Sequence, residues 1–382
     1  METAAHRLHA PLIGRQGGRA DLNTPALVLD LDAFTRNLET MAAFAAARGL
    51  ALRPHAKTHK CAQIARRQIA AGAVGVCCAK LGEAEALADA GIEGLLITSP
   101  VPPGPGVRRL AALARRSPGL MAVVDHLAAV AALGAALVEA EAELTLLVDI
   151  DPGFHRTGVA DADAAVALAQ AIVAAPGLTY GGVQFYCGVQ QHIGPYADRR
   201  AAIASRTEVL KAILARLSEA GLAPALVTGG GTGSHQIDAE LGVLTEIQAG
   251  SYIFMDRQYA DCELVEAEAT PFAQSLMVEA RVVSANHAGA ATVDAGLKAF
   301  STEDGPPPIL DGAPQGSTYR FMGDEHGLIQ APPAAAAPAL GAVVRFAPPH
   351  CDPTVNLYDA YHVVRGDTLV DIWPIEGRGR SA

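Results

Sequence analysis

The sequence predicts an α/β fold in which a (β/α)8 barrel is followed by a mostly antiparallel β domain. From residue 51 onward, short apolar runs alternate with alanine-rich segments of helical period, which is typical of repeated βα units on a parallel sheet. Beyond about residue 265 the runs become longer, and turns rather than helical segments separate them. Eight runs in the first part favour closure into a barrel, and an open doubly wound sheet is the competing arrangement.

The candidate barrel strands follow one another at βα spacing. They are ALRPHA (51–56), VGVCCA (74–79), GLLITS (94–99), LMAVVD (120–125), ELTLLVDI (143–150), TYGGVQFY (179–186), ALVTGG (225–230) and EIQAGSYIF (246–254). The helices expected between them include 106–117, 127–140, 162–174 and 198–220.

We expect the domains to be a barrel at 26–264 and a β domain at 265–382. The run TPALVLDLDAF contains a strand at 26–31 that is surplus to the eight, so it is available to the β domain. Later strands are expected in SLMVEARVVSA, ATVDAGL, GAVVRFAP and DAYHVVRGDTLVDIWP, and the low-complexity segment at 331–342 is interpreted as a connector.

Composition excludes several classes of function. A formal net charge of −11 leaves no basic stripe for a nucleic-acid backbone. No stretch of about 18 apolar residues is present for a membrane span, and the first residues have no apolar signal core, so we expect a cytoplasmic protein. The six cysteines show no CxxC spacing, which argues against a disulfide framework or a zinc ribbon and favours small buried residues.

The segment ALRPHAKTHKCAQIA (51–65) concentrates basic residues at the end of the first predicted strand. If 51–57 is extended, alternation places Arg53, His55 and Lys57 on the face that lines the barrel. Lys57 then lies at the carboxyl end of the strand, where barrel enzymes carry their chemistry. A partly desolvated lysine near other cations can serve as a Schiff-base nucleophile. The alternative is a solvated loop.

A glycine-rich run, VTGGGTGSH (227–235), follows the seventh strand, and AGSYIFMD (249–256) follows the eighth. Barrels bind phosphate with these loops, because glycine lets backbone N–H groups approach closely. Neither GxGxxG nor GK[ST] is present, so a dinucleotide site and a P-loop are not indicated, and a tight turn is the alternative. The expected phosphate contacts are Thr228, Gly230, Gly231, Ser251 and Tyr252.

In PPHCDPTVNLYD (348–359), His350 and Asp352 are two residues apart, so on an extended segment both side chains point to one side. Such a pair supplies two ligands to one metal ion and leaves the others to water. That favours octahedral Mg²⁺ or Mn²⁺ over a closed zinc site.

Six motifs, in order along the chain, resemble one family. They are RPHAKTHK, TGGGTGS, GSYIFMD, DAGLKAFS (294–301), GDEHG (323–327) and PPHCDPTVNLYD. This family is the D-threonine aldolase and D-serine dehydratase group of pyridoxal-phosphate enzymes, which have the alanine-racemase-like fold. The resemblance extends over nearly the whole chain, from TPALVLDLDAF to LVDIWPI.

The resemblance implies roles for individual residues. Lys57 would carry pyridoxal 5'-phosphate as a Schiff base, and the glycine-rich loop and GSY segment would hold its phosphate. Arg156 of DPGFHRTGV would lie near the cofactor's phenolic oxygen, and Tyr186 of QFYCG would contact its ring. A surface ion pair and a packed core aromatic are the alternatives for these two. His192 of VQQHIG resembles the base for the β-hydroxyl, and His59 is the alternative base.

The resemblance also implies a metal held by His350 and a second ligand two residues later. In the dehydratase branch that ligand is typically a cysteine with zinc, whereas this chain has Asp352 there and Cys351 between, which favours the aldolase branch. We therefore expect a D-threonine aldolase that uses Mn²⁺ or Mg²⁺ to cleave D-β-hydroxy-α-amino acids to glycine and an aldehyde. The resemblance implies a homodimer.

Three other functions remain open from the sequence. A D-3-hydroxyaspartate aldolase would yield glycine and glyoxylate, and a D-serine dehydratase would yield pyruvate and ammonia. A non-enzymatic pyridoxal-phosphate carrier is the third, but such proteins are typically a barrel alone, so the β domain argues against it.

Overall fold

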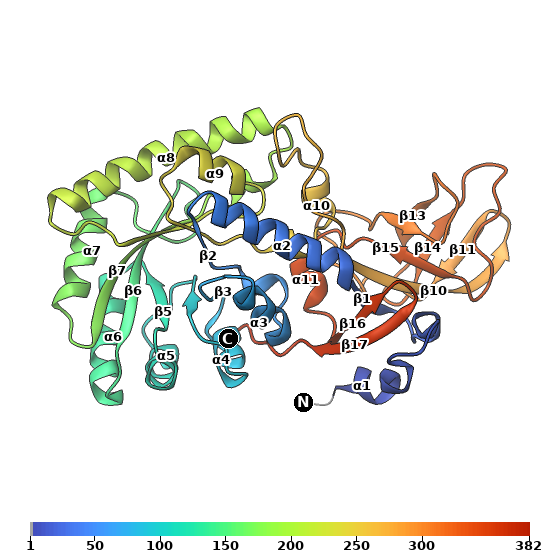
Figure 1. Cartoon of the computed structure of the whole chain (residues 1–382), viewed down its shortest axis with the longest axis horizontal. Coiled ribbons are helices and arrows are strands. Elements are labelled where there is room, and N and C mark those ends of the chain that lie inside the picture. The colour runs from blue at the N-terminus through green and yellow to red at the C-terminus, as the bar shows by residue number, and fades with distance from the viewer. Residues whose placement is uncertain (1–2) are drawn as a thin grey trace. The chain divides into compact units, whose positions relative to one another are not determined.

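The computed structural model describes residues 3–382, which form two compact units (Figure 1). The barrel unit contains residues 41–250, 262–269 and 379–382. The sheet unit contains residues 3–40, 251–261 and 270–378. The chain therefore leaves the sheet unit, builds the barrel unit and returns.

Within the described residues, the barrel unit has an eight-stranded parallel sheet in the order β2-β9-β8-β7-β6-β5-β4-β3. The strands are β2 (Ala51–Leu52), β3 (Val76–Cys78), β4 (Leu95–Ile97), β5 (Met121–Val124), β6 (Leu144–Ile150), β7 (Leu178–Phe185), β8 (Leu226–Gly229) and β9 (Glu246–Ile247). A parallel bridge joins His55 to Cys77, and the Cys77 N–H donates to the Pro54 carbonyl at 2.8 Å. These contacts connect β2 to β3 and complete a ring of neighbours, which confirms the predicted fold class.

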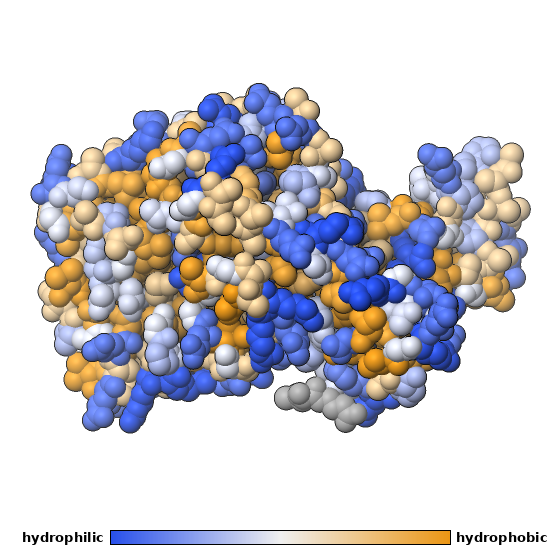
Figure 2. Space-filling view, in the orientation of Figure 1, coloured by the Kyte–Doolittle hydropathy of each residue, from blue (hydrophilic) through white to orange (hydrophobic). Residues whose placement is uncertain are grey.

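Helices separate these strands, as βα units require. They are α3 (Ala62–Ala70), α4 (Leu81–Asp89), α5 (Pro105–Arg116), α6 (Leu127–Ala140), α7 (Ala162–Ala174), α8 (Tyr196–Glu219) and α9 (His235–Leu241), with short 3-10 turns η3 (Ala56–Thr58) and η4 (Val189–His192). Helix α5 shows why they form: Val107, Leu110 and Leu113 recur at helical spacing and are buried, whereas Arg108 and Arg115 are exposed. Figure 2 accordingly shows hydrophilic and hydrophobic residues intermixed over the visible face of the barrel unit.

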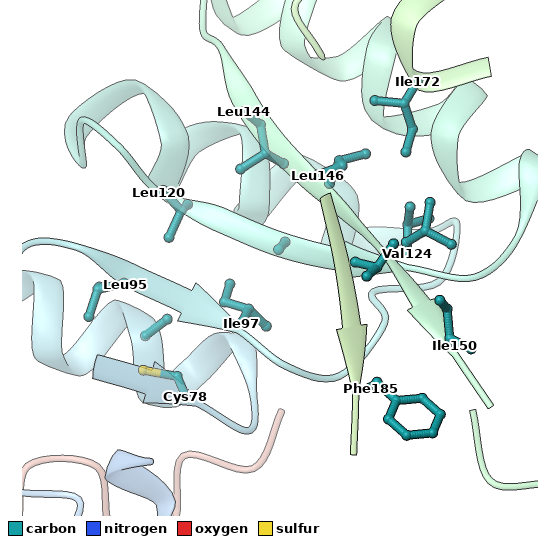
Figure 3. Packing of buried hydrophobic residues seen from close by; sticks show 14 of the residues in the cluster. Cys78, Leu95, Ile97, Leu120, Val124, Leu144, Leu146, Ile150, Ile172 and Phe185 are labelled. Carbon is teal, nitrogen blue, oxygen red and sulfur yellow. The ribbon is translucent and has the colours of Figure 1, made fainter. Parts of the chain in front are cut away.

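Because side chains alternate along each strand, the barrel unit has two buried layers, one between the strands and the helices and one in the lumen. Residues such as Ile97, Val124 and Leu146 pack against the helices (Figure 3). Their neighbours form a second cluster of Cys77, Leu96, Val123 and Leu147 on the opposite face, which is the lumen. The lumen is therefore packed at this level rather than open.

The sheet unit has a nine-stranded, mostly antiparallel sheet within the described residues. Its strands are β1 (Ala26–Asp30), β10 (Leu276–His287), β11 (Ala290–Val293), β12 (Ile309–Asp311), β13 (Thr318–Phe321), β14 (Gly327–Gln330), β15 (Val343–Phe346), β16 (Ala360–Arg365) and β17 (Thr368–Pro374). Strand β1 lies between β10, to which it is antiparallel, and β16, to which it is parallel. The strand that was surplus to the barrel count thus belongs to this sheet.

Short helical elements complete the structure. They are α1 (Ala4–His9), η1 (Ala10–Leu12), η2 (Gly18–Asp21), η5 (Ser251–Ile253), α10 (Arg257–Ala260) and α11 (Cys351–Val355) in the sheet unit, and α2 (Leu31–Ala47), which runs from one unit into the other. Across residues 3–382, no helix has both the length and the apolar character that a membrane crossing needs. All six cysteines are buried and unbridged.

The structure corrects three local expectations. Strand β2 contains only residues 51–52, with one further bridge at His55, and Lys57 lies in the 3-10 turn η3 rather than on a strand. Pro54 has no N–H to donate to a neighbouring strand, which explains the early end. Residues 251–253 form η5 instead of continuing the eighth strand.

The third correction concerns the segment of His350 and Asp352, which the sequence predicts to be extended, because Cys351–Val355 form the helix α11. His350 is its extended N-cap residue, and Asp352 lies in its first turn. An acidic residue and a proline are both favourable in the first turn of a helix, so HCDP was readable as a helix start.

Candidate active site

The turn that carries Lys57 is fixed by His55. The Lys57 backbone N–H donates to His55 Nδ1 at 3.3 Å, so the ring proton is on Nε2. That nitrogen lies 3.0 Å from Thr98 Oγ1, whose hydroxyl in turn donates to the Cys78 carbonyl at 3.2 Å. His55 therefore ties the turn η3 to the ends of β3 and β4, and Lys57 is held, half-buried, beyond the carboxyl end of β2.

The other cations of RPHAKTHK have carboxylate partners. Arg53 Nε donates to Glu246 Oε1 at 3.0 Å, and Lys60 Nζ forms an ion pair with Glu83. All four side chains are at most 10% exposed. These two cations therefore serve buried ion pairs, and the role of Lys57 as the cofactor-binding lysine stays a prediction.

A chain of polar side chains crosses the lumen beneath this turn. Thr228 Oγ1 donates to Glu246 Oε1 at 2.8 Å, and Gln248 Nε2 donates to Thr228 Oγ1 at 3.0 Å and to Gln184 Oε1 at 3.2 Å. Gln184 Nε2 then donates to Asp149 Oδ1 at 2.9 Å. The Thr228 hydroxyl thus belongs to this network, and the phosphate contact that the sequence suggested for Thr228 stays a prediction.

Asp149 and its neighbours line a small pocket with Arg156, Tyr186 and Gln184 at the carboxyl ends of β6 and β7. Burial raises the pKa of Asp149 to about 6, against the opposing effects of the hydrogen bonds from Gln184 and Thr157. The Arg156 guanidinium lies 5.7 Å from the centre of the Tyr186 ring and 5.5 Å from that of Phe154, which is cation–π geometry. The structure thus brings together the two residues that the resemblance assigned to the cofactor ring.

The loop that carries Arg156 is organised by Asp151. Its Oδ1 accepts backbone N–H groups from Gly153, Phe154 and His155 at 2.8–3.0 Å. These bonds lower the pKa of the Asp151 carboxyl, although burial alone would raise it. These hydrogen bonds therefore fix the conformation of the loop that carries Arg156.

The glycine-rich loop between β8 and α9 is buried and closely packed. The Gly231 N–H donates to Ser234 Oγ at 2.9 Å and the Gly233 N–H to Gln191 Oε1 at 3.0 Å. A side chain at Gly229 would place its Cβ 1.8 Å from the Phe185 carbonyl oxygen, and Gly230 has a φ of +68°. Glycine is thus required here by the turn itself, and phosphate binding by Gly230 and Gly231 stays a prediction.

Two further predicted phosphate contacts, Ser251 and Tyr252, lie in η5 of the sheet unit. Both are buried, and the Tyr252 ring lies 5.7 Å from that of Phe272. The Ser251 carbonyl accepts the Met255 N–H at 2.8 Å, which turns the chain toward α10. Their role at a phosphate also stays a prediction.

The predicted metal ligands come together at the start of α11. His350 Nε2 lies 3.9 Å from Asp352 Oδ2. Two ligand atoms that bind one Mg²⁺ at about 2.1 Å can lie at most about 4.2 Å apart, so a single ion can reach both. The side chains are 25% and 13% exposed, which leaves room for water as further ligands. The donor set of imidazole and carboxylate fits the ions predicted from the sequence.

Cys351, between the two, is fully buried, and its thiol donates to Asp352 Oδ1 at 3.4 Å. Burial, together with the charges of Asp256 and Asp352, raises the pKa of its thiol well above the ordinary value. A protonated, buried thiol is a poor metal ligand, so His350 and Asp352 stay the predicted pair.

Sequence reasoning missed two residues near this pair. Asp256 is buried, and its carboxylate accepts the Cys351 N–H at 2.8 Å and the Tyr259 N–H at 3.2 Å, so it begins both α11 and α10. An aspartate before RQYA was a readable N-cap signal. The second, Glu303, hydrogen-bonds His350 Nδ1 at 2.8 Å, and its 47-residue separation left no sequence signal.

The two candidate bases have different surroundings. His192 is exposed at the end of η4. His59 is fully buried: its Nδ1 accepts the Cys61 N–H at 3.1 Å, and its Nε2 lies 3.2 Å from Gln68 Oε1. Both ring nitrogens of His59 are therefore used within the barrel unit, and we do not carry it forward as a base.

Comparison with known proteins gives the family. The sequence matches the family described as "Alanine racemase, N-terminal domain" over residues 29–258 and that described as "Putative serine dehydratase domain" over residues 275–364. It is 42% identical over 362 residues to a D-threonine aldolase from Arthrobacter sp., across 95% of this chain and 94% of the relative. The chain belongs to the D-threonine aldolase family. The sequence-based recognition of this family is confirmed.

Two further comparisons bear on this family member. It is 37% identical over 366 residues to a 3-hydroxy-D-aspartate aldolase from Paracoccus denitrificans (strain Pd 1222), across 95% of this chain and 94% of that one. The structure of a D-threonine aldolase from Filomicrobium marinum superposes with a TM-score of 0.91 at 42% identity, and covers 94% of this chain and 97% of that chain. The prediction of a pyridoxal-phosphate-dependent lyase is therefore confirmed at the level of the family.

Proposed function

We propose that this chain is a divalent-metal-dependent D-threonine aldolase, which cleaves D-β-hydroxy-α-amino acids to glycine and an aldehyde. The observation that carries the proposal is the His350–Asp352 pair, whose ligand atoms lie 3.9 Å apart at the start of α11. A carboxylate at the second position favours Mn²⁺ or Mg²⁺, whereas a thiolate would favour zinc. The 42% identity to a D-threonine aldolase supports the same branch.

The residues of the barrel unit fit pyridoxal phosphate. Lys57 offers an amine on a fixed turn, Arg156 and Tyr186 offer a cation and an aromatic face, and the glycine-rich loop after β8 would lie against the phosphate. When bound, the cofactor supplies the conjugated ring that accepts electrons from the substrate's Cα. Lys57 would hold the cofactor through its side-chain amine.

The remaining roles concern the substrate's β-hydroxyl. His350 and Asp352 hold the cation, whose charge lowers the pKa of that hydroxyl. His192, which is exposed at the end of η4, would take its proton so that the Cα–Cβ bond can break. Every step then uses a residue that the sequence predicted.

Two alternatives are tested together with this proposal. The first alternative is a 3-hydroxy-D-aspartate aldolase, a relative of 37% identity, which would form glyoxylate as the aldehyde product. The second is a dehydratase, which would act on D-serine. Purified protein is incubated with pyridoxal phosphate and Mn²⁺ and with D-threonine, D-3-hydroxyaspartate or D-serine in separate reactions. We expect glycine and acetaldehyde from D-threonine, at a higher kcat/KM than for the other two.

The outcomes separate the alternatives. Faster formation of glyoxylate would favour the hydroxyaspartate aldolase, and pyruvate from D-serine would favour the dehydratase. Activity that survives complete chelation of metal would contradict the role given to His350 and Asp352. The variant Asp352→Asn tests the metal site directly. It keeps the size of the side chain, and it should lose most activity at low Mn²⁺.

We also propose that the enzyme is a homodimer, as the resemblance implies. Light scattering on the eluting protein should give twice the chain mass of 39.3 kDa. A monomer that is fully active would contradict this proposal.

A further inference from the structure

One short segment of the sheet unit, residues 301–303, contacts both the backbone and the ring of His350. Ser301 Oγ accepts the His350 N–H at 3.0 Å and donates to the His350 carbonyl at 3.1 Å. Two residues later, Glu303 Oε1 lies 2.8 Å from His350 Nδ1. The segment thus fixes both the backbone and the ring of the same histidine.

Thr354 strengthens this attachment. Its hydroxyl donates to the His350 carbonyl at 2.8 Å and accepts the Ser301 N–H at 3.0 Å. The backbone of His350 is therefore set by residues on both sides of it in space, and the remaining freedom of the side chain is rotation of the ring. The Glu303 carboxylate removes that freedom.

The tautomer follows from this contact. A carboxylate accepts hydrogen bonds, so in the neutral imidazole Nδ1 carries the proton and Nε2 is the nitrogen with the lone pair. Nε2 is the nitrogen that lies 3.9 Å from Asp352 Oδ2. A histidine that binds a metal through one nitrogen commonly donates from the other to a carboxylate, which fixes the ring and raises its basicity.

We propose that Glu303 is a positioning residue for the metal site, acting through His350 to hold Nε2 toward Asp352. The inference rests on the proposed function insofar as His350 and Asp352 bind the metal. Glu303 is 47% exposed, so its hydrogen bond adds little to folding stability, and its effect is on the metal.

A competing arrangement would make Glu303 itself a ligand. Ligand atoms of Glu303, Asp304 and His350 lie within 4.8 Å of one another, which would use His350 Nδ1 rather than Nε2. Asp304 has other contacts, however, because its carboxylate accepts Gln258 Nε2 and its carbonyl accepts Arg257 Nη1 at 3.1 Å. The two arrangements predict different results for amide substitutions.

The test is Mn²⁺ affinity of pyridoxal-phosphate-loaded protein after metal removal, measured by the free-Mn²⁺ electron paramagnetic resonance signal. Glu303→Ala should weaken Mn²⁺ binding about 10- to 100-fold. Glu303→Gln keeps an acceptor oxygen for the Nδ1 proton and should stay within about 3-fold of the parent, because a neutral acceptor still fixes the ring. Asp304→Asn should leave the affinity unchanged. Unfolding midpoints of the three variants should match the parent.

Equal Mn²⁺ affinity of Glu303→Ala and the parent would overturn the inference. So would losses in Glu303→Gln and Asp304→Asn as large as that in Glu303→Ala, since these would assign the metal to the Nδ1 side. Absence of Mn²⁺ binding by the parent would overturn both this inference and the metal site of the proposed function. The expected affinities without cleavage of D-threonine would leave the inference standing and contradict the proposed function alone.

Discussion

Lys57 and Lys60 are three residues apart, yet the structure gives them different environments. Lys60 lies inside the barrel unit against Glu83, whose other oxygen accepts the Ala79 N–H at 2.8 Å. Lys57 lies on the η3 turn, where its backbone rather than its side chain is tied down by His55. Lys60 therefore serves a buried ion pair, whereas the chemical role of Lys57 stays a prediction.

We expect Lys57→Ala and Lys60→Ala to separate chemistry from stability. Lys57→Ala should abolish the aldimine absorbance band and reduce aldolase activity by at least 10³-fold, an order-of-magnitude figure for loss of a covalent group, with little change in stability. Lys60→Ala leaves a buried carboxylate without its cation and should cost about 3–5 kcal/mol of unfolding free energy. Absorbance spectra and urea unfolding measure the two effects. Full activity of Lys57→Ala would remove the basis of the proposed function.

Asp149 lies in an environment that is unfavourable for its negative charge. Its pKa is raised from 3.8 to about 6, so above pH 6 the folded state holds a charge that the unfolded state solvates better. This cost is present in full above about pH 6, is relieved as pH falls toward 3.8, and is absent below that value. A buried charge retained beside Arg156 and Tyr186 is typical of a functional site.

Asp149→Asn should therefore stabilise the protein at pH 8 by about 1–3 kcal/mol and have almost no effect at pH 4. Urea unfolding at the two pH values measures this difference. Asp198→Asn, at an exposed position of α8, is the control and should change stability by less than about 0.5 kcal/mol at either pH. Equal effects of Asp149→Asn at pH 4 and pH 8 would contradict the assignment.

At the scale of secondary-structure elements, α10 and α11 share one N-terminal anchor. Asp256 Oδ1 accepts the Tyr259 N–H of α10, and its Oδ2 accepts the Cys351 N–H of α11. Burial raises the pKa of Asp256 although both hydrogen bonds lower it. A single carboxylate thus joins GSYIFMD to PPHCDPTVNLYD, two motifs that are about a hundred residues apart in the sequence.

Asp256→Ala should destabilise these two helices locally. Loss of one cap costs about 0.5–2 kcal/mol, and here two caps are lost at a buried site. Amide hydrogen exchange should rise at residues 257–260 and 351–355 while the β-strands of the sheet unit stay protected. Asp261→Ala, on an exposed side chain at the end of α10, serves as the control. Unchanged exchange in α11 would show that Asp256 does not anchor it.

For the molecule as a whole, two buried histidines join the N-terminal segment to strand β16, both within the sheet unit. His9 Nδ1 lies 2.8 Å from His362 Nε2, the Asn23 N–H donates to His9 Nε2 at 3.0 Å, and His362 Nδ1 lies 3.2 Å from the Leu27 carbonyl. Burial, together with the nearby His9 and His6, lowers the pKa of His362 to about 4. Both partners are therefore neutral in the folded protein.

This pair predicts acid destabilisation of the sheet unit. The unfolded state takes up protons below about pH 6.5 and the folded state resists until about pH 4, so stability falls as pH decreases through this window. We expect a loss of about 1–3 kcal/mol between pH 7.5 and pH 5, seen in urea unfolding. His362→Leu should flatten this dependence, whereas His287→Gln, at an exposed position, should not. An unchanged slope in His362→Leu would place the acid sensitivity elsewhere.

The fold could be predicted because it depends on local pattern. The period of two in the strands, the period of 3.6 in helices such as α5, and their alternation are properties of neighbouring residues. Strand β1 was recognised as surplus for the same reason, since counting runs needs no tertiary information. The motifs that carry Lys57, Arg156, Tyr186 and the His350–Asp352 pair were likewise readable as short segments with a chemical purpose.

Partners distant in the sequence could not be predicted. No local pattern pairs Arg53 with Glu246, Glu303 with His350 or Asp256 with Cys351, because their separations of 47 to 193 residues are set by the crossing of elements. Local conformation also failed where capping outweighs periodicity, as in η3 and α11. The sequence by itself determined the architecture, the family and the type of chemistry. Only the tertiary structure decided which cations are neutralised, which nitrogen of His350 faces Asp352 and where the Thr228 hydroxyl points, since these depend on contacts made only when the chain is folded.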